Sequence, residues 1–145
     1  MSLRTALVYA LNANAPLAAL VGAQIYPGVV PEDGLLPAVT WQIISIPRDN
    51  PRSLGGRNGT PPARVQLSAV SKLLTDCDAI ASALRAGLDA FTGPLAPGFT
   101  VVETILKDEK DFYGDLGDGT GRVVFRTVLD FLIRYREAPP RPNLI

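Results

Sequence analysis

The stretch that decides the fold is residues 122–136, which read Arg-Val-Val-Phe-Arg-Thr-Val-Leu-Asp-Phe-Leu-Ile-Arg-Tyr-Arg. Odd-numbered positions are apolar with one exception, Thr127, and the charged residues all stand at even-numbered positions. Side chains alternate between the two faces of a strand, so the pattern predicts one long strand with an apolar face and a mostly charged face. At about 3.3 Å per residue it would be roughly 50 Å long, whereas most strands have about 5–6 residues. A strand that outruns its domain needs cover, and another subunit is a natural source.

Composition limits the classes of protein to which the chain can belong. It has 145 residues, enough for one domain with a core, and 47% of them are hydrophobic. The mean hydropathy of +0.18 predicts a globular protein and not a disordered one. The net charge of zero provides no overall attraction to nucleic acid or membrane. No apolar run approaches the roughly 18–20 residues of a membrane span, and the first residues do not resemble a signal peptide. We expect the protein to act in the cytoplasm, or in an assembly built there.

Residues that could carry chemistry are scarce. The chain has no histidine, the commonest general base and metal ligand. The one cysteine, Cys77, stands on the apolar stripe of a predicted helix, which indicates a packing thiol and not a nucleophile. The acidic segment 108–119 does not match the spacing of a calcium loop, so we interpret it as a solvated hairpin turn. Gly55-Gly56 lacks the ending of a phosphate loop. We predict no catalytic residue, no cofactor and no metal.

The first third of the chain predicts two short helices followed by strands. Ser2 and Asn14 are residue types that cap helices, and each precedes an apolar run with helical spacing. Residues 24–27 are a short extended piece. Residues 39–46 alternate as a strand, and Ile44 on its polar side predicts that its far end is buried on both faces.

The middle of the chain predicts a loop, a strand and the main helix. Residues 47–62 hold four prolines and three glycines, so we expect a long loop that projects from the body. A strand follows at 64–69. Residues 71–91 show apolar side chains at spacings of three and four, which predicts one helix with a buried stripe. Its start is at Ser71 or at the Thr75-x-x-Asp78 pattern.

The last third predicts a hairpin and an arm. A strand at 100–107 leads through the acidic turn 108–121 into the long strand, and residues 138–145 form a proline-rich arm. The order of elements predicts an α+β fold, with a mixed, mainly antiparallel sheet of four to five strands and helices on one face. Residues 1–137 form the single domain. The apolar face of the long strand should pack on the helix stripe, which joins Val123, Phe125, Leu129, Phe131 and Ile133 to Cys77, Ile80, Leu84 and Leu88.

Three parts of the sequence together are similar to a known family. They are the opening 17–28 (Leu-Ala-Ala-Leu-Val-Gly-Ala-Gln-Ile-Tyr-Pro-Gly) with 36–42 (Leu-Pro-Ala-Val-Thr-Trp-Gln), the helix segment 80–86, and the closing hairpin of 108–137. In this order and spacing the chain resembles the tail-completion family of long-tailed bacteriophages, also called tail terminator or head–tail joining proteins. The loop 47–62 and the proline-rich arm add least to the resemblance.

The resemblance implies a non-enzymatic structural protein of the virion, located at the top of the tail after assembly in the host cytoplasm. Such a protein forms a homo-oligomeric ring, usually a hexamer, that ends the tail tube and binds the head–tail connector, a stopper or adaptor protein. DNA would meet it only while passing through the ring. Alternatives are another head–tail connector, a tube-like ring component, or a small α+β enzyme or binding domain.

A closed ring needs two different surface patches that match each other. The arginines of the 47–62 loop and the acidic segment are one such pair, and the end of the long strand and the arm are further candidates for subunit or partner contacts. As a hypothesis, the interface residues are Arg48, Arg52, Arg57, Asp108, Glu109, Asp111, Asp115, Asp118, Arg134, Arg136, Leu144 and Ile145.

Overall fold

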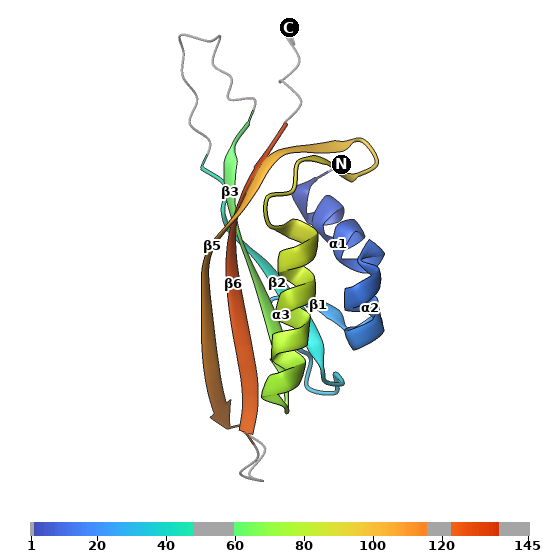
Figure 1. Cartoon of the computed structure of the whole chain (residues 1–145), viewed down its shortest axis with the longest axis vertical. Helices are drawn as coiled ribbons and strands as arrows, with labels where there is room; N and C mark the ends of the chain where they lie inside the picture. The colour runs from blue at the N-terminus through green and yellow to red at the C-terminus, as the bar shows by residue number, and fades with distance from the viewer. Residues whose placement is uncertain (1, 48–59, 116–122, 137–145) are drawn as a thin grey trace, which may run out of the picture.

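A six-stranded sheet organises the computed structural model, which describes residues 2–47, 60–115 and 123–136 (Figure 1). The strands are β1 (Ile25–Pro27), β2 (Ala38–Ser45), β3 (Pro62–Ser71), β4 (Gly93–Ala96), β5 (Phe99–Asp115) and β6 (Val123–Tyr135). Their order in the sheet is β1-β2-β3-β6-β5-β4. Only β1 and β2 run parallel, and every other neighbouring pair is antiparallel. The predicted α+β fold with a mainly antiparallel sheet is confirmed.

The predicted strand number of four to five is wrong, because the sheet has two short edge strands, β1 and β4. β1 has only three residues. β4 begins with Gly93 and Pro94, which in the sequence indicate the end of a helix and not the start of a strand. Proline is tolerated there because β4 lies at the edge of the sheet, where its missing N–H leaves no partner unbonded.

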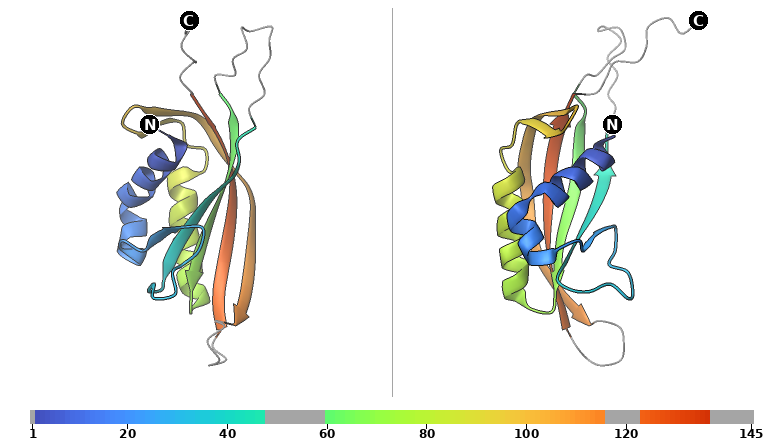
Figure 2. Two further views of the ribbon diagram at one scale, coloured as in Figure 1. Left: turned by 180° about the vertical axis from the view of Figure 1, so that it is seen from behind. Right: turned by 90° about the vertical axis from the view of Figure 1, so that its right-hand side faces the viewer.

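Three helices cover one face of the sheet: α1 (Leu3–Ala13), α2 (Ala15–Val21) and α3 (Leu74–Leu88) (Figure 2). Both predicted caps are confirmed. The side chain of Ser2 accepts a hydrogen bond from the backbone N–H of Thr5, and Asn14 accepts one from Leu17. Asn14 also donates from Nδ2 to the carbonyl oxygen of Ala83, so the same residue fixes the corner between α1 and α2 against α3.

The main helix begins at Leu74, between the two predicted starts at Ser71 and Thr75. Strand β3 continues through Ser71, which pairs with Phe125 on β6. The Ser71 hydroxyl accepts from the N–H of Leu73 and donates to Asp76, so this residue shapes the turn between strand and helix. The N-cap of α3 is Leu73, and its side chain makes no capping hydrogen bond.

The predicted core contact between the long strand and the helix stripe is mostly confirmed. Phe131, Leu129 and Ile133 are at most 1% exposed, and they share one core with the buried face of α3. The prediction is wrong for Val123, whose side chain is 43% exposed. Strand β3 ends opposite Phe125, so β6 continues beyond its cover at Val123 with only β5 beside it.

Two further expectations differ from the structure. Ile44, expected to be buried, is 42% exposed, and it has no partner on β3 because the register between β2 and β3 shifts between Ile43 and Ser45. Residues 108–115 are not a turn, because β5 extends to Asp115 and pairs with β6 along its whole length. The register of the β5–β6 pairing shifts twice, between Val101 and Glu103 and between Leu106 and Asp108. The charged residues beyond the second shift made this part of the strand look like a turn in the sequence.

Candidate interaction surface

The predicted acidic patch is a strand whose charges already have partners. Glu109 pairs with Arg85 on α3, and Lys110 pairs with Asp108 at 3.3 Å. Asp111 accepts a hydrogen bond from the Thr127 hydroxyl at 2.8 Å. Both ion pairs are more than one-third exposed, so each contributes roughly 0–1 kcal/mol. The strand is therefore less available to a basic partner than its composition indicates.

The other predicted interface residues lie at the far end of the sheet or outside the described residues. Arg134 and Arg136 stand at the end of β6, where Arg134 pairs with Glu103 at 3.3 Å. Those outside the described residues are Arg48, Arg52, Arg57, Asp118, Leu144 and Ile145.

The strand register fixes opposite ends of the sheet. Pro62 pairs with Arg134, whereas Asp115 pairs with Val123. The loop that ends near Pro62 therefore joins the sheet at the end opposite to the tip of the β5–β6 hairpin.

The described residues offer little for catalysis. They contain no group of three or more His, Cys, Asp or Glu side chains that could hold a metal ion. Cys77 is fully buried, and its Sγ lies 3.4 Å from the carbonyl oxygen of Phe125. Loss of hydration on burial raises the pKa of this thiol, so the unreactive protonated form is favoured. In the part of the chain that the structure describes, no helix is both long and apolar enough to span a membrane.

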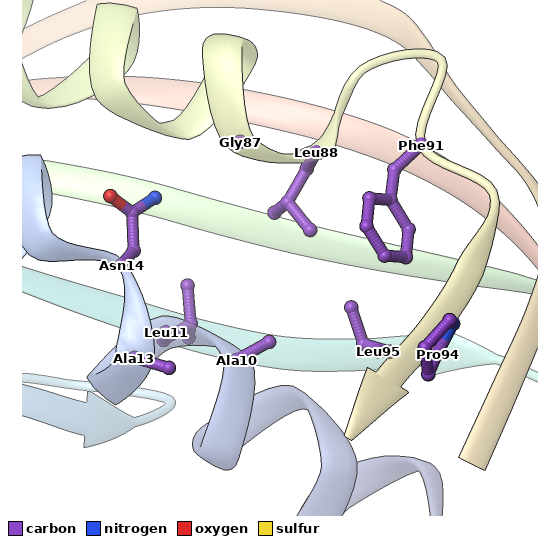
Figure 3. A pocket seen from close by; sticks show the side chains of 9 residues that line it. All are labelled: Ala10, Leu11, Ala13, Asn14, Gly87, Leu88, Phe91, Pro94 and Leu95. Carbon is purple, nitrogen blue, oxygen red and sulfur yellow. The ribbon is translucent and has the colours of Figure 1, made fainter. Parts of the chain in front are cut away.

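A small apolar pocket lies where the end of α3 meets α1 and β4 (Figure 3). Its volume is about 210 Å³. Leu11, Leu88 and Leu95 form its walls and are themselves buried, and Asn14 is its main polar side chain. The side chain of Asn14 is already bonded to Leu17 and Ala83, so no polar group is left to select a ligand. We interpret this pocket as a packing gap of the helix layer.

Exposed apolar side chains are spread along one end of the sheet, and the sequence analysis missed them. Val29 and Leu35 precede β2, Leu73 and Leu74 begin α3, and Phe112 and Tyr113 stand near the end of β5. They are between 46% and 80% exposed. The strand register places these segments along the same end of the sheet, because Ala38, Val70, Arg126 and Phe112 form one row that runs across it from β2 to β5. Only this pairing, which the sequence does not show, reveals that they share one end.

The same end of the sheet has a free edge. β4 pairs with β5 only as far as Val101. Beyond it, the N–H of Ala90 bonds to the carbonyl oxygen of Thr104, and the Asp89 carboxylate accepts from the N–H of Leu106. From Lys107 to Asp115 no described residue pairs with the outer edge of β5. An open edge beside exposed aromatic side chains is typical of a surface that another protein covers.

Comparison with known proteins relates the chain to a protein family and to solved structures. A family model described as Tail completion protein gp17 matches residues 5–136. A chain from a structure titled "Virion of native gene transfer agent (GTA) particle" superposes with a TM-score of 0.69 and 21% sequence identity. The alignment covers 94% of this chain and 96% of that chain, which shows that the two share a fold. No curated protein matches the sequence.

Proposed function

Because the chain belongs to the tail completion protein gp17 family, and is thus a structural protein of a phage-type tail, we propose that it forms a closed ring at the head end of the tail tube. The ring ends the growth of the tube and provides the surface to which the head connector binds. The family match over residues 5–136, which covers nearly the whole described chain, is the observation that carries this proposal.

The structure supports a role in assembly. The fold has a free strand edge at Lys107–Asp115, and the exposed aromatic side chains of Phe112 and Tyr113 stand on it. Groups of this kind are normally covered in the working state of a protein. The shared fold with a chain of a gene transfer agent particle is consistent with such a role. A ring of six subunits and a position between tube and connector belong to the proposal.

The test is deletion of the protein from the particle that carries it. We expect tails of uncontrolled length, or tails of normal length that do not join heads, and supplying the wild-type protein in trans should restore joined particles. Head-attached tails of normal length in the absence of the protein would refute the proposal. A catalytic role predicts a different result, since a small amount of protein would then suffice and would be absent from the finished virion.

A further inference from the structure

A second pocket lies on the sheet face that no helix covers, close to the tip of the β5–β6 hairpin. Its volume is about 210 Å³, and it is lined by Val70, Phe112, Tyr113, Gly114, Val124 and Arg126. Arg126 and Val124 stand at even positions of β6, opposite to the core residues Leu129 and Phe131. We propose that, in the ring, this pocket receives the turn formed by residues 31–34 of the next copy of the chain. The contact rests on the ring proposed above and specifies how it closes.

Gly114 indicates that another chain approaches this pocket. It lies inside β5 opposite Val124, and its φ is outside the left-handed region that would require glycine. A Cβ added at Gly114 would meet no described atom within 4 Å. Glycine weakens a strand, and here neither backbone conformation nor crowding by the described residues explains it. Glycine at such a position is typical of a site where a partner's backbone comes close.

Arg126 gives the pocket its chemical preference. It is half-buried beside Phe112, and its guanidinium makes no hydrogen bond or ion pair with any residue that the structure describes. An arginine among apolar and aromatic side chains is a common centre of binding energy in protein interfaces. Its planar guanidinium binds carboxylates with two parallel hydrogen bonds. The pocket therefore fits a segment that offers a carboxylate beside an aliphatic side chain.

The turn at residues 31–34 has this chemistry. The N–H of Gly34 donates to the carbonyl oxygen of Pro31 at 2.8 Å and closes the turn. A Cβ at Gly34 would lie 2.8 Å from Cγ1 of Val30, so the turn is tightly packed and preformed. Glu32 and Asp33 at its tip are exposed and make no contact with a charged partner among the described residues.

The flanks of the turn complete the match. Val29 and Leu35 are each 70% exposed, which leaves aliphatic surface on both sides of the carboxylates. The apolar walls of the pocket, Phe112 and Val124, offer the complementary surface.

The two surfaces are also placed as a closed ring requires. The turn lies between β1 and β2, on one side of the sheet (Figure 1). The pocket is lined by residues of β3, β6 and β5, and its Phe112–Gly114 segment lies on the free edge of β5 toward the other side. Strand β2 begins at Ala38, which lies in the same row of the sheet as Arg126 and Phe112. A head-to-tail contact between them therefore needs little displacement along the strands. Contacts without such displacement can close into a ring, whereas displaced ones give open helical filaments.

Disulfide trapping in assembled particles tests this contact. The variant Asp33→Cys/Gly114→Cys has one thiol on the turn and one in the pocket. The two positions are separated by at least three strand spacings of about 4.8 Å, which is too far for a disulfide within one chain. Mild oxidation of purified particles should therefore give a ladder of cross-linked subunits that ends at the ring size. The matched control Asp78→Cys/Gly114→Cys, with its first thiol on an exposed position of α3, should give no ladder.

Charge exchange gives an independent result. Arg126→Glu should reduce incorporation into particles by at least about tenfold, as expected for loss of a central arginine contact. Adding Glu32→Arg to this variant should restore most of the incorporation, which a merely structural role of Arg126 would not allow. Gly114→Val fills the pocket, so it should block incorporation without lowering the melting temperature of the isolated protein.

Three results would contradict this contact or the ring on which it rests. If rings form in particles but the Asp33–Gly114 pair does not cross-link, the contact is wrong and the proposed function stands. If cysteines in loop 47–62 cross-link instead to Asp108→Cys of a neighbour, the ring closes through the charge pairing predicted from the sequence. If the protein is absent from the tail, the proposed function itself fails.

Discussion

Replacing Phe131 by alanine is expected to lower the stability of the protein by about 3–5 kcal/mol. Phe131 is 1% exposed, and it is among the largest fully buried side chains of the described residues. It pairs with Val65 on one strand and with Leu106 on the other. These neighbouring strands hold the cavity open when the phenyl group of Phe131 is removed. At roughly 2.1 cal/mol/K per residue, the unfolding entropy of this chain is about 0.3 kcal/mol/K. The melting temperature should therefore fall by about 10–16 °C.

The chain offers a matched control of the same residue type. Phe112 is 53% exposed, so Phe112→Ala should change the free energy of unfolding by less than about 0.5 kcal/mol. Both variants are compared by urea unfolding and by thermal scans of the isolated protein. Equal destabilisation by the two substitutions would refute the assignment of the faces of the hairpin. A loss below about 1 kcal/mol for Phe131→Ala would show that the strand does not pack against the helix layer.

Three further predictions concern the helix corner, the thiol and the surface charges. Asn14→Ala should cost about 1–2 kcal/mol in urea unfolding, because the α2 cap and the bond to α3 are both lost, whereas Asn12→Ala, on an exposed helix position, should be nearly neutral. Burial raises the pKa of the Cys77 thiol, so its contribution to stability is complete below about pH 8.5 and is lost as the pH rises above that value. Urea midpoints measured on both sides of that pH should show this fall in the wild type and a smaller fall in Cys77→Ala. Arg85→Ala should lower stability by less than about 1 kcal/mol, and by less still at high salt, because its ion pair with Glu109 is more than one-third exposed; a larger loss would mean that the pair is shielded from solvent.

Local sequence patterns, namely helix-capping residues and the alternation of apolar and polar positions, predicted much of the fold. Ser2 and Asn14 carry the helix caps that their residue types indicate, and the alternation along the long strand identified the core residues Leu129, Phe131 and Ile133. The short edge strands escaped prediction because a three-residue strand and a strand that starts with Gly-Pro have no distinctive pattern of their own. Their positions depend on pairing with distant residues.

The candidate interface was harder to predict for a physical reason. Charge can be read directly from the sequence, so the acidic segment was predicted as an interface. In the folded chain, however, Glu109 pairs with Arg85, and Asp111 accepts a hydrogen bond from Thr127. The exposed Phe112 and Tyr113 meet Val70 and Arg126 only through strand register. No spacing rule links residue 70 to residue 112, so the pocket could not be found before the sheet was known.

The central claim is a closed ring of this protein at the junction of tail and head. The most direct measurement is a cryo-electron microscopy reconstruction of the neck of the particle that carries the chain. The account predicts one closed ring of identical copies between the last tube ring and the head connector, with the β1–β2 edge of each copy against the β5–β6 hairpin of the next. Density for the protein at another position in the particle, or as copies that do not contact one another, would contradict it.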